Sequence, residues 1–132
     1  MCIRDRYISD HEPALAIDMT AVEPEWVSGY GLAFGADALF HDAQYTEEEY
    51  PGKIGWGHSS VADAVMFAQR SRAGRLVLFH HDPMHCDDEL ELLLERAKEL
   101  SNGGPPPALA YEGMEIDLGG APEPEAVVAR ED

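Results

Sequence analysis

The stretch "RLVLFHHDP", from Arg75 to Pro83, decides the fold class of this 132-residue chain. Its four consecutive apolar residues, Leu76 to Phe79, are typical of a buried strand in a central sheet. The apolar run stops at His80, His81 and Asp82. Because ligands in α/β folds gather at the carboxyl ends of strands, this segment is a candidate site as well as a core strand.

Two other predicted strands also end at ionisable residues. The strand within "RYISD" ends at Asp10 and His11, and the strand at 38–40 ends at His41 and Asp42. Strand ends on one edge of a sheet converge in space, so residues that are distant in the sequence can meet there. The same pattern at three strand ends predicts a shared site.

Helices are predicted between and after these strands. Apolar residues recur at helical spacing after Ser60, and Ser and Asp residues precede the longer segments as typical caps. The expected elements are a weak helix within 27–34, a helix from Ser59 or Ser60 to Gly74, a helix from Asp87 to about Leu100, and a hairpin of 108–111 with 114–118. This order predicts an α/β fold with helices packed on the sheet.

The composition disfavours several partner classes. The chain has 26 acidic and 9 basic residues and a net charge of -17, which disfavours a basic nucleic-acid-binding surface and attraction to anionic membranes. An anionic substrate would need a local positive centre, such as a metal ion. No apolar run reaches the roughly 18 residues of a membrane span. Two cysteines without a CxxC spacing fit a reduced, cytoplasmic setting.

The histidines allow two interpretations. His58 lies in "GHSS", at the threshold of the second predicted helix. A single histidine after a strand is usually a surface or hydrogen-bonded residue, whereas imidazoles and carboxylates that converge are the ligand set for zinc, manganese or iron. The residue types and their spacing leave a metal site and a structural role as equal alternatives.

Three stretches together resemble the C-terminal half of the metallo-β-lactamase-fold hydrolases. They are "YISDHEP" (7–13), "ALFHDAQYTEEEYPGKIGWGHSSVADA" (38–64) and "RLVLFHHDP" (75–83). The nearest branch is the phosphodiesterase-like one, which includes tRNase Z and related cyclic-nucleotide phosphodiesterases. The resemblance implies the C-terminal half of an αββα sandwich and two divalent metal ions, usually zinc, with manganese or iron as alternatives.

The resemblance also implies roles for four residues. Asp10 resembles the family's bridging metal-binding aspartate, and His80 resembles its final metal-binding histidine. His58 resembles the histidine of a Gly-His-Ser-Thr motif that assists phosphodiester cleavage. Asp42 resembles the acidic partner that orients this histidine, although the family more often has glutamate there. The family's HxHxDH motif and a later histidine are absent from the sequence, so these residues form half of an active site.

Other polar residues near these motifs are expected to have structural roles. His11 is expected not to be a metal ligand but to contact substrate, and His81 to lie in a supporting or surface position. Asp82 is expected to shape the turn before Pro83. His85 and Cys86 are expected to be incidental, with a second metal pair as the alternative. Two aromatic residues, Tyr50 and Trp56, would either line a substrate cleft or cover the sheet edge.

The function implied by the resemblance is metal-dependent hydrolysis. A metal-activated hydroxide would attack a phosphodiester bond in a small phosphodiester or nucleotide-like substrate. A carboxylic-ester, thioester or lactone hydrolase with the same metals is the first alternative, and a non-catalytic acidic module is the second. The pairing of Asp42 with His58 favours the phosphodiester.

The domain boundaries follow from the same motifs. Residues 1–6, "MCIRDR", resemble a translated sequencing adapter rather than a native start. Residues 7–118 are expected to form the C-terminal half of the metallo-β-lactamase-like domain, and 119–132 a disordered acidic tail. We therefore expect the isolated chain to be inactive as a hydrolase and only marginally stable.

Overall fold

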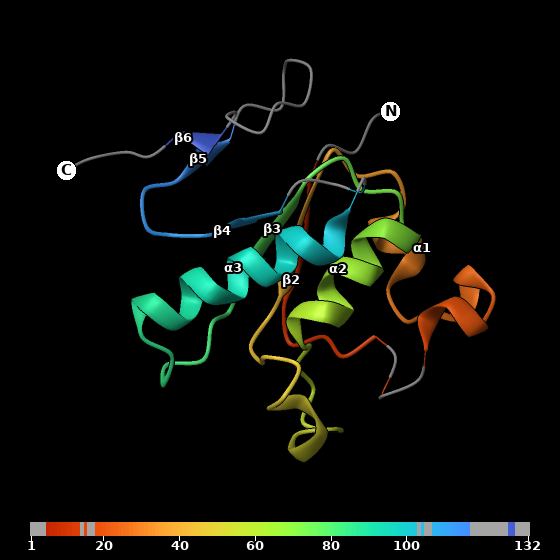
Figure 1. Ribbon diagram of the computed structural model, residues 1–132. Helices are drawn as coiled ribbons and strands as arrows, with labels where there is room; N and C mark the ends of the chain where they lie inside the picture. Colours follow the sequence, from red (N-terminus) through yellow and green to blue (C-terminus); the bar gives the residue numbers. More distant parts are fainter. Residues whose placement is uncertain are drawn as a thin grey trace.

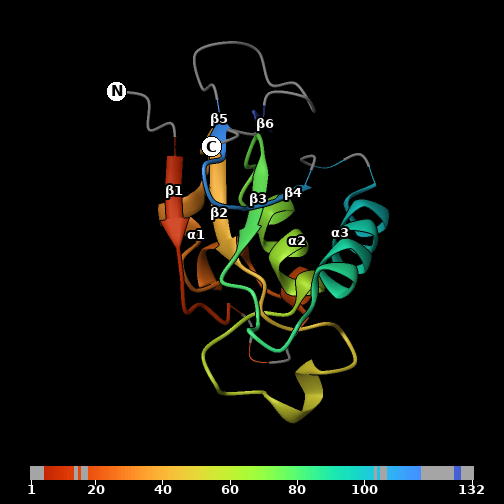
Figure 2. The ribbon, with the colours of Figure 1, turned by 90° about the vertical axis from the view of Figure 1, so that its left-hand side faces the viewer.

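A four-stranded parallel sheet forms the centre of the protein (Figure 2). The computed structural model describes residues 5–13, 15, 18–102, 104 and 107–116, and the backbone of 127–128. The strands β1, β2, β3 and β4 are neighbours in that order. Their bounds are Asp5–Ile8, Ala38–Asp42, Leu76–Phe79 and Pro107–Leu109. The expected order of strands and helices is therefore confirmed, although β2 extends through His41 and Asp42 instead of ending before them.

In the part of the chain that the structure describes, three helices and three 3₁₀ turns connect the strands (Figure 1). The helices are α1 (Tyr30–Ala33), α2 (Val61–Arg70) and α3 (Asp87–Ser101), and the turns are η1 (Met19–Ala21), η2 (Pro24–Trp26) and η3 (Tyr50–Gly52). α2 packs on β2 and β3, and α3 packs on α2 and β4. Among the described residues, no helix is both long enough and apolar enough to cross a membrane.

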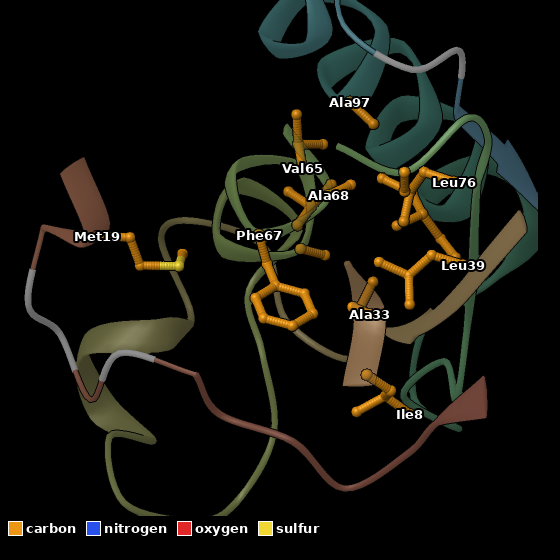
Figure 3. Close-up of a cluster of buried hydrophobic side chains, with 14 of the residues drawn as sticks. Ile8, Met19, Ala33, Leu39, Val65, Phe67, Ala68, Leu76 and Ala97 are labelled. Atoms are coloured by element: carbon orange, nitrogen blue, oxygen red, sulfur yellow. The ribbon is translucent and has the colours of Figure 1, made fainter. Parts of the chain in front are cut away.

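The hydrophobic core lies between the sheet and this single helical layer (Figure 3). Leu39 and Leu76 of the sheet are almost fully buried, and Phe67 of α2 has no exposed surface. The core cluster also includes Ile8 from β1 and Ala97 from α3, so one cluster joins the sheet to both long helices. Complete burial of a leucine or phenylalanine side chain contributes about 1.5–3 kcal/mol to folding.

Capping hydrogen bonds stabilise the first turns of the two long helices. The Ser60 side chain accepts a hydrogen bond from the Asp63 backbone N–H at 3.1 Å, which confirms the predicted cap of α2. The predicted cap of α3 was wrong by one residue, because Asp87 is the first helical residue and Cys86 occupies the N-cap. Glu89 accepts a hydrogen bond from the Cys86 N–H, and the acidic first turn suits the positive end of the helix dipole.

The predicted terminal hairpin is also wrong. Pro107–Leu109 instead adds to β3 as the parallel strand β4, and β5 (Glu115–Ile116) pairs with β6 (Val127–Val128). Parallel pairing to a buried strand satisfies more of the backbone than a two-stranded hairpin, which is marginal by itself. Most of the predicted acidic tail lies outside the described residues. Asp5 and Arg6 of the adapter-like start form the first half of β1.

One face of the sheet carries aromatic side chains that no helix covers in the described part of the chain. Tyr7 is 65% exposed and stacks on Phe40, with ring centroids 4.3 Å apart. Phe79 meets Tyr7 edge-on and is also partly exposed. The described structure therefore has the sheet and one helical layer of a sandwich, with an apolar face open on the other side.

We predict that the 132-residue chain by itself melts over a broad range and at low temperature, because the face carrying Tyr7, Phe40 and Phe79 stays in water. Covering apolar surface stabilises a fold by about 25 cal/mol per Å², and this face does not gain that free energy. Differential scanning calorimetry of the purified chain measures the transition. A sharp, cooperative melt at the temperature typical of a mesophilic domain, about 45–65 °C, would contradict the prediction.

Candidate metal centre

The parallel register brings the ends of three strands to one edge of the sheet. Ile8, the last residue of β1, pairs with His41 of β2, and Asp42, the last residue of β2, pairs with Phe79 at the end of β3. Asp10 follows β1, Asp42 ends β2 and His80 follows β3. His58 belongs to the loop before α2, and this loop lies below the strands in Figure 2. The predicted convergence of these side chains is therefore confirmed.

These four side chains form a cluster whose potential ligand atoms lie within 4.8 Å of one another. The Asp10 carboxylate is 3.4 Å from His80 Nε2 and 3.5 Å from His58 Nδ1. The two imidazole rings of His58 and His80 are stacked, with centroids 4.8 Å apart. Asp10 is mostly exposed and Asp42 is fully buried, so the cluster extends from the surface into the interior.

The buried carboxylate of Asp42 orients His58. Asp42 Oδ2 accepts a hydrogen bond from His58 Nδ1 at 2.7 Å, within the predicted 2.6–3.2 Å. Asp42 Oδ1 accepts from the backbone N–H groups of Gln44 and Ser59 at 3.2 and 3.3 Å. Because the proton of His58 lies on Nδ1, its Nε2 is the free nitrogen of the neutral ring. The carboxylate is thus fully engaged in holding the ring and the loop.

Asp10 and His80 have an unusual backbone conformation. Their φ angles are +49° and +59°, in the left-handed region that residues other than glycine rarely adopt. Such conformations cost of order 1–3 kcal/mol each and persist where the surrounding structure enforces them, frequently at functional sites. Both residues leave their strands through this turn, and their side chains face each other as a result.

The donor set fits a divalent metal ion. Two ligand atoms about 2.1 Å from one tetrahedral ion lie roughly 3.4 Å apart, and His80 Nε2 and Asp10 Oδ1 are 3.4 Å apart. Neither oxygen of Asp10 has another hydrogen-bond partner among the described contacts. Asp42 is the less suitable ligand, because its oxygens already accept three hydrogen bonds.

A buried histidine pair lies beneath the cluster. His41 faces the helical layer, and its Nδ1 donates to the Asp42 backbone carbonyl at 2.8 Å. Its Nε2 therefore accepts from His11 Nδ1, also at 2.8 Å. Burial, together with the smaller effect of the neighbouring His11, lowers the pKa of His41 to about 3. His11 packs edge-on against Phe67, so it supports the site from below. Its contact with substrate stays a prediction.

The segment after His80 has structural contacts. The Asp82 carboxylate accepts from the Met84 N–H at 2.9 Å, which confirms its predicted role in the turn. His85 Nε2 pairs with the Glu49 carboxylate at 2.9 Å, and Cys86 caps α3. His81 is half-buried, and burial lowers its pKa. Within the described residues, the metal-type cluster contains none of these side chains.

The loop before His58 contains two aromatic residues, Tyr50 and Trp56, in different environments. Tyr50 is buried, and its hydroxyl donates to Glu12 at 2.6 Å, so it holds the loop and does not line a cleft. Trp56 is 65% exposed, with the Lys53 ammonium 4.1 Å from its ring. The contacts that Glu12 and Ser59 make with distant segments were not predicted from the sequence. The only sequence signal for these two residues was that they lie inside two of the stretches that carry the family resemblance, 7–13 and 38–64.

Similarity to known proteins agrees with this geometry. No protein-family model matches the chain. Ribonuclease Z from Shouchella clausii is 36% identical over 71 residues, which cover 54% of this chain and 23% of that protein. Ribonuclease Z from Pyrobaculum arsenaticum is 37% identical over 61% of this chain and 26% of that protein. Ribonuclease Z from Haloferax volcanii is 26% identical over 86% of this chain and 35% of that protein.

The fold is shared more widely. The metallo-β-lactamase fold protein YhfI from Bacillus subtilis matches 63% of this chain and 32% of its own, with a TM-score of 0.50 and 23% identity. The matched part of the chain has the metallo-β-lactamase fold. Its sequence resembles the ribonuclease Z branch of that fold, as the three motifs indicate. The chain spans about a quarter to a third of the length of the curated relatives described above.

We predict that His41 stays neutral down to about pH 4 in the folded protein, because its pKa is lowered to about 3. The unfolded chain binds a proton at this histidine below about pH 6.5, whereas the folded chain does not. As the pH falls from about 6.5 to about 3, this histidine therefore lowers the free energy of unfolding by about 1.4 kcal/mol per pH unit.

Histidine-selective NMR measures the titration of His41 directly, and denaturation of a His41→Gln variant measures its share of the pH slope. The slope should become shallower in the variant. An imidazole signal of His41 that titrates near pH 6.5 would contradict the prediction.

Proposed function

We propose that this chain supplies half of the active site of a metal-dependent phosphodiesterase. The observation that carries the proposal is the cluster of Asp10, Asp42, His58 and His80 at one sheet edge, with His58 held by Asp42 at 2.7 Å. The ribonuclease Z similarity supports the same chemistry. The acidic surface, with a net charge of -17, makes the metal site the natural point of attraction for a phosphate group.

Asp10 and His80 are the proposed metal ligands. The Asp10 side chain is 67% exposed, which leaves its carboxylate accessible to metal ions. When bound, two zinc ions, or manganese or iron in their place, would lower the pKa of a water molecule and polarise the phosphoryl group. The two ligands of this chain do not complete a catalytic zinc site, which normally has three protein ligands. The remaining ligands would come from outside the described residues.

His58 is the proposed acid of the reaction, and Asp42 its positioning partner. The hydrogen bond from Nδ1 to Asp42 turns Nε2 outward from the buried carboxylate, and Asp42 stabilises the charged ring. The protonated Nε2 would donate to the oxygen of the leaving group as the phosphorus–oxygen bond breaks. General acid catalysis of this kind typically contributes about 10²–10⁴-fold.

The proposed substrate is an RNA phosphodiester, because the relatives are named ribonucleases. This replaces the small, nucleotide-like substrate expected from the sequence. Only 9 basic residues are present in the chain, so most cationic contacts with an RNA backbone would have to come from elsewhere. The chemistry and the lack of disulfide spacing fit a cytoplasmic enzyme. An ester, thioester or lactone hydrolase is the second candidate, since an open metal site also activates carbonyl groups.

We predict that His58→Ala, made in a full-length protein that contains this sequence, lowers turnover of an RNA phosphodiester about 10²-fold or more and leaves the metal content intact. Turnover of an RNA substrate and of bis(p-nitrophenyl) phosphate is measured beside metal analysis by mass spectrometry. His85→Ala is the matched control, because His85 pairs with Glu49 outside the cluster. Loss of metal together with activity would show that His58 is a ligand.

We predict a different pattern for Asp10→Ala and His80→Ala in the same full-length protein, which should each lose metal and activity together.

In the isolated chain, the two ligands should bind zinc only weakly, and hydrolysis should stay at the level of a protein-free control. Isothermal titration with zinc measures the affinity. Tight zinc binding with phosphodiester turnover by the isolated chain would show that its own residues complete the site.

A further inference from the structure

The loop that carries His58 is closed at its base and held again near its end. Tyr45 and Ser60 form a parallel bridge, in which the Tyr45 N–H donates to the Ser59 carbonyl and the Val61 N–H to the Tyr45 carbonyl. Between them, residues 46–59 run as a surface loop, whose first half is held by the pairing of Glu49 with His85. A second attachment near Gly57 therefore decides where His58 lies.

The Glu12 carboxylate is this second attachment. Glu12 Oε1 and Oε2 accept from the Gly55 N–H at 3.0 and 2.9 Å, and Oε1 accepts from the Gly57 N–H at 3.0 Å. The Tyr50 hydroxyl donates to Oε2 at 2.6 Å. Gly55 and Gly57 both have φ of +89°, which turns their N–H groups toward one acceptor and which side chains would oppose. Backbone N–H groups gathered in this way form an anion-binding concavity.

The position of Glu12 in the chain links this attachment to the metal cluster. Glu12 is two residues after Asp10, and Gly57 directly precedes His58. Ser59 adds a parallel contact, since its hydroxyl donates to the His11 carbonyl while its N–H donates to Asp42. The segment after β1 and the loop before α2 are thereby fixed to each other on both sides of His58.

We propose that Glu12 is a positioning residue that sets His58 against Asp42 and Asp10 by holding the amides of Gly55 and Gly57. The catalytic consequence rests on the proposed function, but the geometric role does not. The carboxylate suits this role because it is acceptor-only. A glutamine would bring an N–H₂ group toward the two amides, and an aspartate is shorter by one C–C bond, about 1.5 Å.

The charge state of Glu12 agrees with this role. Partial burial raises its pKa, but the hydrogen bonds from Tyr50, Gly55 and Gly57 and the nearby His58 outweigh burial and lower the pKa below the usual value. Glu12 is therefore ionised at neutral pH. Charge-assisted hydrogen bonds of this kind are about twice as strong as those between neutral groups.

The test compares Glu12→Gln with Glu25→Gln in the longest natural protein that contains this sequence. Glu25 is an exposed carboxylate of η2, so its variant removes the same charge away from the loop. Glycine and histidine are labelled with ¹⁵N, and spectra are recorded in EDTA, so that metal content does not enter. In Glu12→Gln, hydrogen exchange of the Gly55 and Gly57 amides should accelerate about tenfold or more. The His58 nitrogens should shift toward a mixture of tautomers, as expected when the contact with Asp42 loosens.

Hydrogen exchange in the core distinguishes a loss of loop positioning from a general loss of stability. Exchange at Leu78, a buried residue of β3, should remain unchanged in Glu12→Gln, and Glu25→Gln should match the wild type in every signal. Tyr50→Phe, which removes one of the donors, should change the glycine amides less than Glu12→Gln does. Unchanged signals of His58, Gly55 and Gly57 in Glu12→Gln would overturn the proposal, and so would an equal loss of protection at Leu78.

An activity measurement distinguishes this proposal from the proposed function. If the wild type hydrolyses a phosphodiester, Glu12→Gln should lower kcat about tenfold with little change in KM and none in metal content. A rise in KM with kcat unchanged would contradict a role through His58. If the wild type lacks phosphodiesterase activity, the proposed function fails, while the NMR comparison still decides the role of Glu12.

Discussion

Asp42 carries a carboxylate with no exposed surface, at the end of the second strand of the sheet. A buried charge is costly unless hydrogen bonds compensate it, and here the donors come from three places in the loop and the helix threshold: Gln44, His58 and Ser59. The same contacts that stabilise the charge also fix the loop after β2 and the start of α2. Stability of this part of the fold and geometry of the site therefore depend on one interaction.

The parallel sheet explains why such different segments meet. Its register places the ends of β1, β2 and β3 side by side, and each strand delivers one polar side chain to the shared edge. The left-handed turns at Asp10 and His80 then bring two of these side chains together, at a local cost in backbone energy. Beneath them, the neutral pair of His11 and His41 fills the space that faces α2 without adding a buried charge.

The two faces of the sheet have different roles. The face under α2 forms a closed core around Phe67, whereas the opposite face leaves Tyr7, Phe40 and Phe79 partly in water among the described residues. In the αββα sandwich that the resemblance implies, a second sheet would pack on this face. The chain spans 23–35% of the length of the ribonuclease Z relatives described above.

The sequence alone determined the local features of this protein. Apolar runs and Ser60 as a cap predicted the first three strands and α2, because these signals are carried by neighbours in the chain. The polar residues after the strands indicated a shared site, and the family resemblance then pointed to the four members of the cluster. The tertiary structure decided what depends on distant contacts. β4 joins β3 instead of forming a hairpin, and Glu12 acquires its role only because Gly55 and Gly57 fold over it. A single carboxylate in a loop has no periodic pattern, so its partners are determined by packing and hydrogen bonding across the fold.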